Sequence, residues 1–381
     1  MNDAPSLRFD DLNLDSRILA ALGPAGYVVP SPIQALAIPP ILDGRDVEAL
    51  ARTGTGKTAA FVLPVMHRLL SQEHSPDTRG GRARALILSP TRELANQTAG
   101  TARTCVRHCG LTVTVAIGGV PKDRQARALA AGTDILVATP GRLLDHLTDG
   151  TLNLDGTTCL VLDEADQMLD LGFLEDVRAI AARLPVRHQT LMFSATMSPA
   201  ISALARQLLH KPVRIAPPDA PATLPRIRQQ AIFVPTARKA ATLIALLRRA
   251  PDDRTIIFTR TRQGADTLAR ALGKAGVTAT ALHGDHGQAK REQTLNAFRQ
   301  GTLRALVATD VMARGIDVDD VALVVNFDIP EQPETYIHRI GRTARAGRRG
   351  TALSLCDPSE RLLLRDIEKQ TRARIAVIES P

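Results

Sequence analysis

The segment ARTGTGKT (51–58) contains the residue types of a loop that binds the phosphates of a nucleotide. Gly54 and Gly56 let backbone N–H groups approach phosphate oxygens. Lys57 offers a positive charge to the terminal phosphates, and Thr58 offers a hydroxyl to Mg²⁺. The apolar run before the segment and the helical pattern after it supply the strand and the helix start that such a loop needs. The segment therefore predicts a phosphate loop; the alternative is an ordinary glycine-rich helix start.

The segment VLDEAD (161–166) places carboxylates at the end of an apolar run. Buried carboxylates are costly unless they hold a cation or act on water. Asp163 is suited to hold Mg²⁺ through its water shell, and Glu164 to orient and deprotonate an attacking water. The alternative is a favourable acidic helix N-terminus. Following a phosphate loop, the two carboxylates predict hydrolysis of a nucleoside triphosphate.

Short apolar runs alternate with longer stretches of helical periodicity along the whole chain. This alternation predicts an α/β fold in which parallel sheets are covered on both faces. Most of the runs are followed at once by a polar or Gly-containing cluster, and ligands of open parallel sheets bind beyond the carboxyl ends of the strands. The strand candidates are residues 47–50, 85–88, 134–138, 159–162, 190–193, 255–258, 277–282, 304–308, 322–327 and 351–355.

The proline-rich segment APPDAPATLP (216–225) predicts a stiff linker between two domains. Its ten residues span roughly 30 Å at about 3.1 Å each. The predicted organisation is a nucleotide-reading segment at 1–35, a first domain at 36–215, the linker, a second domain at 226–370 and a short tail at 371–381.

Composition favours a polyanionic partner, because the 48 Lys and Arg residues outnumber the 39 Asp and Glu residues for a net charge of +9. The alternative is a basic surface that serves solubility alone. Cys105, His108 and Cys109 invite a metal site, but they lack a second cysteine pair and predict two helix cysteines instead. The polar N-terminus and the absence of an apolar run near the roughly 18 residues of a membrane span predict a cytoplasmic protein without membrane contact.

In their order along the chain, these motifs resemble those of the DEAD-box ATP-dependent RNA helicases of superfamily 2, and among them the bacterial RhlE-type group. The similarity runs from Phe9 to Lys369. That family's phosphate loop reads A-x-T-G-x-G-K-T, so Ala51 fits it. The resemblance implies two tandem RecA-like parallel-sheet domains, ATP and Mg²⁺ as cofactors, and a monomer that binds RNA within ribosome-assembly or RNA-decay complexes. It leaves open a core-only member or part of a longer chain.

The resemblance also assigns residues of the ATP site. An amide matches the donor and acceptor of the adenine edge, so Gln34 would bind adenine, with Phe9 and Tyr27 packing nearby. The ATP-binding residues implied are Phe9, Tyr27, Gln34, Arg52, Thr53, Gly54, Thr55, Gly56, Lys57, Thr58, Gly315 and Asp317. The catalytic residues implied are Lys57, Asp163, Glu164, Arg342 and Arg345, with Thr58 and Asp163 as metal ligands.

Contacts to the RNA backbone are implied on both domains, because hydroxyls, loop N–H groups and arginines bind phosphates without reading bases. Turn chemistry explains each cluster equally well when it is taken alone. The implied RNA-binding residues are Pro90, Thr91, Arg92, Gly118, Gly119, Thr139, Gly141, Arg142, Gln288, Arg291, Thr309 and Arg314. Residues implied to couple hydrolysis to strand separation are Asp166, Ser194, Thr196, His338 and Arg339.

The arginine-rich segment YIHRIGRTARAGRRG (336–350) could be a solvated basic patch, as charge runs often are. The resemblance instead makes Arg342 and Arg345 arginine fingers on the γ-phosphate, with His338 and Arg339 bracing the interface with the first domain. The chain departs from the family's pattern at two positions. Arg52 in the phosphate loop replaces glutamine, and Ala344 between the two proposed arginine fingers replaces glycine.

The resemblance implies an enzyme that hydrolyses ATP in response to RNA and locally unwinds short duplexes by nucleotide-driven domain closure. One alternative is an ATP-gated RNA clamp or RNA–protein assembly factor that does not unwind productively. A processive DNA translocase of the same superfamily is the other.

Overall fold

The computed structural model describes residues 7–51, 54–71, 81–216, 227–250, 253–310, 321–344, 350–371 and 373–380. The chain divides into two compact units, Met1–Ala220 and Pro221–Pro381. The boundary between them falls inside the proline-rich segment of the sequence. Within the described ranges, none of the helices combines the length and the apolar character needed to cross a membrane.

The first unit is a sheet of seven parallel strands in the order β3-β4-β2-β5-β6-β1-β7. Its elements are η1 Phe9–Leu12, α1 Ser16–Leu22, α2 Pro32–Leu42, β1 Val47–Leu50, α3 Lys57–Ser71, β2 Ala83–Leu88, α4 Arg92–Val106, β3 Val113–Ala116, α5 Lys122–Ala130, β4 Thr133–Ala138, α6 Pro140–Thr148, β5 Cys159–Asp163, α7 Ala165–Asp170, α8 Leu174–Ala181, β6 Gln189–Ser194, α9 Pro199–Leu208 and β7 Val213–Ile215.

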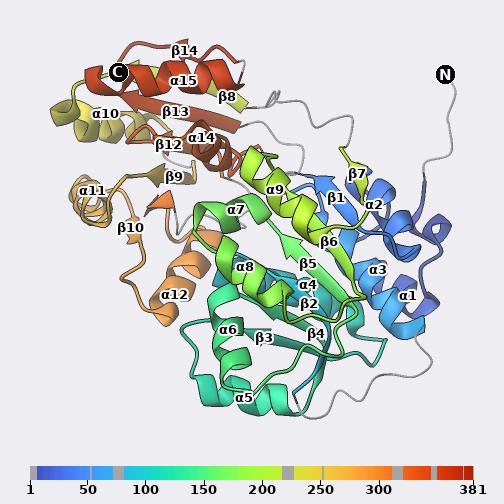
Figure 1. Ribbon diagram of the computed structural model, residues 1–381. Coiled ribbons are helices and arrows are strands. Elements are labelled where there is room, and N and C mark those ends of the chain that lie inside the picture. The colour runs from blue at the N-terminus through green and yellow to red at the C-terminus, as the bar shows by residue number, and fades with distance from the viewer. Residues whose placement is uncertain are drawn as a thin grey trace, which may run out of the picture. The chain divides into compact units, whose positions relative to one another are not determined.

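Helices cover both faces of this sheet (Figure 1). Alternate residues of each strand point to opposite faces, so Ile87 of β2 joins one apolar cluster and Leu88 joins the other. The first cluster includes Phe61 of α3, and the second includes Val177 of α8. This two-sided burial explains why the central strands are continuous apolar runs.

The second unit repeats the architecture, with seven parallel strands in the order β10-β11-β9-β12-β13-β8-β14. Its elements are β8 Ile227–Phe233, α10 Thr236–Arg249, β9 Thr255–Phe258, α11 Arg262–Lys274, β10 Ala279–Leu282, α12 Gln288–Arg299, β11 Ala305–Ala308, β12 Leu323–Asn326, α14 Pro333–Ile340, β13 Gly350–Cys356, η2 Pro358–Glu360, α15 Arg361–Thr371 and β14 Ala376–Val377. The α/β fold with parallel sheets is thus confirmed.

The prediction that Cys105 and Cys109 both lie in a helix holds for Cys105 only. Cys105 lies in the last turn of α4, whereas Cys109 lies beyond the end of that helix and its Sγ is 3.7 Å from the carbonyl oxygen of Cys105. Both are buried free thiols. They are the kind of small apolar residue that packs in a core.

A buried ion pair connects helix α10 to the short helix η2 of the second unit. Lys239, only 1% exposed, donates from Nζ to Glu360 Oε2 at 2.6 Å and to the carbonyl oxygen of Phe327 at 2.8 Å. Glu360 Oε1 also accepts from the backbone N–H of Ile329 at 3.1 Å. Removing one partner of a buried pair is costly because the other charge stays in the interior.

We expect Lys239→Met to lower the free energy of unfolding of this unit by about 3 kcal/mol, because it leaves Glu360 buried without its main counter-ion. The matched control is Arg238→Met, since Arg238 is an exposed neighbour on the same helix and its replacement should change stability by about 0.5 kcal/mol or less. Hydrogen exchange of α10 peptides in increasing urea reports on this unit. Equal protection in the two variants would contradict the expectation.

Candidate nucleotide and nucleic-acid sites

The phosphate loop connects β1 to α3 at the carboxyl edge of the first sheet. Gly54 and Gly56 have φ values of 83° and 89°, a region that favours glycine. Helix α3 begins at Lys57, so its first N–H groups point toward the loop. Arg52 and Thr53 lie outside the described residues. The backbone of the described part therefore has the geometry of an anion-binding helix start.

Lys57 lies in a buried cluster of opposite charges. Its Nζ is 3.3 Å from Glu164 Oε1 and 3.9 Å from Asp163 Oδ1, and all three side chains are almost fully buried. Burial opposes the charged amine, but the carboxylates of Glu164, Asp163 and Asp166 outweigh it, so the pKa of Lys57 is raised. The lysine is therefore held charged at the position where terminal phosphates would bind.

Asp163 fits a role as a ligand to Mg²⁺. Its Oδ1 is buried without a hydrogen-bond partner among the described residues, and buried polar atoms normally have one. Burial raises the pKa of Asp163 to about 7, with Lys57 opposing the shift and the carboxylates of Glu164 and Asp166 adding to it. A hard divalent cation would supply the missing partner, with Thr58 on the first turn of α3 as the second candidate ligand.

Glu164 occupies a strained backbone position between β5 and α7. Its φ of 55° lies in the left-handed region, which costs a non-glycine residue on the order of 1–3 kcal/mol. The carboxylate is held from two sides, because Gln167 Nε2 donates to Oε2 and Lys57 faces Oε1. Such strain is typical of functional sites, and here it fixes the direction of the candidate general base.

Asp166 connects the carboxylate cluster to the end of the next strand, β6. Its Oδ2 accepts hydrogen bonds from the N–H of Ala195 at 3.1 Å, the N–H of Thr196 at 2.9 Å and the hydroxyl of Thr196 at 3.1 Å. Ser194 Oγ donates to the carbonyl oxygen of Thr196 at 2.7 Å. The structure thus brings the three coupling candidates of this unit together, while their role in coupling stays a prediction.

Gln34 contacts the phosphate loop directly. Its Nε2 donates to the carbonyl oxygen of Gly56 at 3.1 Å, and its Oε1 accepts from the N–H of Ser31 at 2.8 Å. Ser31 Oγ in turn donates to the carbonyl oxygen of Thr55 at 2.8 Å. A primary amide has two N–H donors and two acceptor lone pairs. Among the contacts of the described residues, this leaves one donor and one acceptor of Gln34 for a second partner such as an adenine edge.

Two aromatic residues expected beside the adenine lie together. The rings of Phe9 and Tyr27 pack edge to face, with centroids 6.1 Å apart. Phe9 is buried in the first apolar cluster, and Tyr27 packs against that cluster. This contact anchors the segment that leads into α2, on which Gln34 lies.

The RNA-contact candidates of the first unit follow three neighbouring strands. Strands β3, β4 and β2 are adjacent in the sheet, so the residues after them share one edge. Arg92 lies against Gly118 and Gly119, where an added Cβ on Gly118 would come within 2.8 Å of its Nη2. Arg142 Nη1 donates to the carbonyl oxygen of Val120 at 2.9 Å. The remaining members of this group are Pro90, Thr91, Thr139 and Gly141.

Arg339 is held by bonds within its own unit, where it is 3% exposed. Its expected role at an interface with the first domain stays a prediction. Arg339 forms a two-point ion pair with Asp310, donates to Asn326 Oδ1 at 3.1 Å and stacks over the ring of Phe258. Burial and geometry make it a residue that positions the ends of β11 and β12.

The other candidates of the second unit are only partly described. Arg342 donates from Nε to the carbonyl oxygen of His338 at 3.2 Å, one turn earlier in the chain. Thr309 lies directly after β11, and Arg291 is buried on α12. Ala344 has a φ of 58°, so the methyl group at this departure from the family stands in a conformation that favours glycine. Arg314, Gly315, Asp317, Arg345 and the side chain of Gln288 lie outside the described residues.

Three residues of these sites were missed. Ser31, Gln167 and Asp310 hold the phosphate loop, Glu164 and Arg339 respectively. Ser31 had a signal, because S-P-I-Q fits the capping-box pattern in which a helix-start serine precedes a glutamine by three residues. Gln167 lies three residues from Glu164 but belongs to no such pattern, and Asp310 pairs with Arg339 of the distant helix α14.

Comparison with known proteins identifies the family. Residues 31–204 match the DEAD/DEAH box helicase domain, and residues 238–347 match the helicase conserved C-terminal domain. A DEAD box protein from the hyperthermophile Methanococcus jannaschii is 37% identical, with a TM-score of 0.54, over 97% of this chain and 99% of that chain. The chain belongs to the DEAD-box helicase family. The family prediction is confirmed, while the RhlE-type subgroup stays a prediction.

Curated DEAD-box relatives are longer than this chain. The ATP-dependent RNA helicase DeaD of Escherichia coli (strain K12) is 47% identical over 98% of this chain and 58% of its own length. Saccharomyces cerevisiae Dbp5, solved with RNA and ADP BeF3, is 30% identical with a TM-score of 0.88 over 98% of this chain and 96% of that one. Mss116p, solved with single-stranded RNA and AMP-PNP, is 28% identical with a TM-score of 0.88, over 100% of this chain and 80% of that chain. The RecA-like fold of both units follows from these matches.

Lys57→Ala should weaken ATP binding by roughly ten- to a hundred-fold, as expected for a lost charge-assisted hydrogen bond to phosphate. The control is Lys122→Ala, since Lys122 is a half-buried lysine of the same unit that pairs with Asp149. Titration with a fluorescent ATP analogue in the presence of Mg²⁺ measures both variants. Wild-type affinity in Lys57→Ala would place the phosphates elsewhere.

Proposed function

We propose that this chain is an ATP-dependent RNA helicase that separates short duplexes locally. The observation that carries the proposal is the connected site at the carboxyl edge of the first sheet. There Lys57 and Glu164 face each other, and Asp166 links them to the segment after β6. One site thus combines groups suited to phosphoryl transfer with a hydrogen-bonded path to a neighbouring strand end.

The proposed hydrolysis uses residues whose positions suit their roles. Lys57 binds the terminal phosphates, and Glu164 orients a water and accepts its proton as the oxygen attacks the γ-phosphorus, giving ADP and phosphate. Asp163 and Thr58 would hold Mg²⁺, which neutralises charge on the phosphates. Gln34 would bind adenine with its second donor and acceptor, while its first pair keeps the loop in place.

The proposed RNA groove in the first unit lies along the ends of β3, β4 and β2. Arg92, Arg142 and the backbone at Gly118–Gly119 are groups that bind phosphates and carry little base preference. Support comes from two relatives of the same fold that were solved with RNA and a nucleotide, Dbp5 and Mss116p. The net charge of +9 agrees with a polyanionic partner.

We propose that ATP drives closure of the two domains and that Arg342 and Arg345 complete the site on the γ-phosphate. Such arginine fingers contribute about 10³- to 10⁵-fold in rate in phosphoryl transfer. Closure would bend a bound strand, and each base-pair step costs on the order of 1–2 kcal/mol to open, so one cycle opens only a few pairs. A monomeric state, a cytoplasmic location and ribosome-assembly or RNA-decay complexes as partners belong to this proposal as expectations from the family.

The function is tested by ATP turnover and duplex separation with purified chain. We expect RNA to raise the ATPase rate and homopolymer DNA of equal length to leave it near its basal value. We also expect ATP to separate a short blunt or overhanging RNA duplex faster than a long one. RNA-stimulated ATPase without separation would make the chain an ATP-gated clamp, and stimulation by DNA would make it a DNA translocase; either result contradicts the proposal.

Arg342→Ala should leave ATP binding detectable and remove RNA-stimulated turnover, because the first unit alone holds the loop and its carboxylates. The control is Arg270→Ala, since Arg270 is an exposed arginine of the second unit that bonds only to its own helix among the described contacts. Binding of a nucleotide analogue and the ATPase rate with saturating RNA are measured for both. Undiminished stimulation in Arg342→Ala would refute the arginine-finger assignment.

A further inference from the structure

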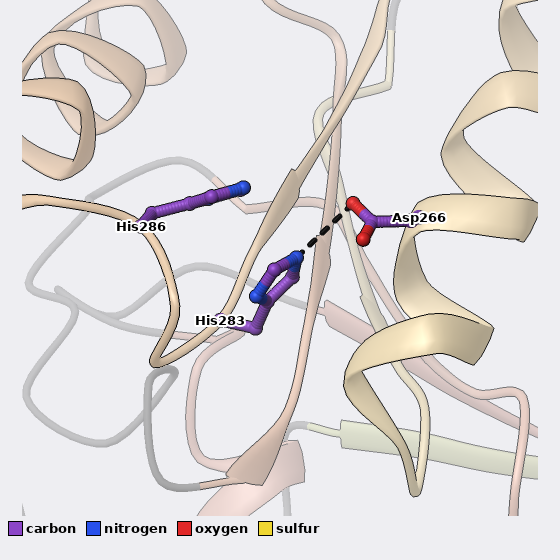
Figure 2. A group of neighbouring side chains, drawn as sticks. All are labelled: Asp266, His283 and His286. Carbon is purple, nitrogen blue, oxygen red and sulfur yellow. Dashed lines mark hydrogen bonds and ion pairs between the residues drawn. The ribbon is translucent and has the colours of Figure 1, made fainter.

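Two histidines and an aspartate meet at the edge of the second sheet, in a group that the proposed function does not use. His283 and His286 lie in the turn between β10 and α12, and Asp266 projects from α11 (Figure 2). Within the described ranges, this is the one group of three or more such side chains whose donor atoms lie close enough to share an ion, all within 4.8 Å of one another.

The spacing of the first two donors already suits a metal. His283 Nε2 is 3.0 Å from Asp266 Oδ1. Two ligand atoms in neighbouring positions around a metal, each about 2.0–2.1 Å from it, are roughly 2.9–3.4 Å apart. An ion can therefore replace the shared proton without moving α11 away from the end of β10.

The second histidine is stacked on the first. The ring centroids of His283 and His286 are 4.0 Å apart, with the planes 36° from parallel. His283 is 4% exposed, and the Nδ1 atoms of both rings are buried without a hydrogen-bond partner in the part of the chain that the structure describes. Such atoms are rare in folded proteins, so both rings have hydrogen-bonding capacity that the described residues do not use.

A further carboxylate faces the outer nitrogen of His283 from beyond hydrogen-bond distance. Asp285 Oδ2 lies 3.9 Å from His283 Nδ1, and Asp285 is itself paired with Arg262 at 2.5 Å. Histidines that bind metals commonly donate their second ring N–H to a carboxylate. When Nε2 binds a metal, the neutral ring carries its proton on Nδ1, the nitrogen that faces Asp285.

We propose that Asp266, His283 and His286 form a binding site for a divalent transition metal ion, with Zn²⁺ as the best fit and Asp285 as the orienting carboxylate. Two imidazoles and a carboxylate match zinc in ligand type, and a water completes four-coordination. Mg²⁺ is a poorer fit to this site because it prefers oxygen donors. The ion would link α11 to the turn that precedes α12.

The test uses the untagged full chain, freed of metal with EDTA and kept in millimolar Mg²⁺ so that the carboxylates near Lys57 do not bind the probe. Zn²⁺ is titrated in competition with a chromophoric zinc indicator, and Co²⁺ is added separately to record its visible absorption. We expect one equivalent of Zn²⁺ and a Co²⁺ spectrum typical of four-coordination with nitrogen and oxygen ligands. Neither ATP nor RNA is present, so the result is independent of the proposed function.

The variants His286→Ala and Asp266→Asn should each weaken Zn²⁺ binding at least a hundred-fold, and Asp285→Asn should weaken it about ten- to a hundred-fold. The turn that carries His286 is at the surface, so His286→Ala does not depend on replacing the buried His283. The control His210→Ala removes an exposed histidine of the first unit and should bind Zn²⁺ normally. Circular dichroism checks that each variant is folded.

Three results would overturn the proposal. They are no stoichiometric binding by the wild-type chain, unchanged binding in folded His286→Ala and Asp266→Asn, and a Co²⁺ spectrum dominated by sulfur ligands. The last would assign the ion to the cysteines instead.

Discussion

The candidate nucleotide site of the first unit depends on opposite charges that balance one another in the protein interior. Lys57, Asp163 and Glu164 are almost completely withdrawn from water, and none of them could stay ionised there alone. Their mutual attraction keeps the lysine charged, while burial, together with the neighbouring carboxylates, raises the pKa of Asp163 to about 7. The cluster is therefore negative and incompletely satisfied. A site of this kind favours the entry of a cation together with a phosphate chain, which restores the balance.

The order of the strands gives this cluster its neighbours. Strand β6 lies between β5, which ends in the carboxylates, and β1, which ends in the phosphate loop. A nucleotide bound at the phosphate loop would therefore lie next to the segment after β6, which Asp166 holds through three hydrogen bonds. The other half of the same edge, from β2 to β3, carries the arginines suited to phosphodiester backbones. A single sheet edge thus carries, side by side, the residues proposed for the nucleotide and those proposed for the RNA backbone.

Much of the fold was predictable because central parallel strands are apolar throughout and end in polar clusters. The strands not foreseen, β3, β7, β8 and β14, lie at or next to the sheet edges, where burial is incomplete and the pattern weakens. The phosphate loop and the acidic motif were found because their residues are local in sequence. The internal ion pair of Arg339 was not foreseen because an arginine-rich segment does not reveal which guanidinium turns inward. The group around His283 was missed because Asp266 comes from α11, whereas the two histidines lie in the turn after β10.

The close approach of Gly56 and Gln34 has an evolutionary consequence. A Cβ on residue 56 would come within 2.6 Å of the amide nitrogen that recognises the loop, so the two positions share one small volume. A larger residue at position 56 would have to adopt a φ of 89° and push the Gln34 amide away from the loop. We therefore expect substitutions at the two positions to occur together among related sequences.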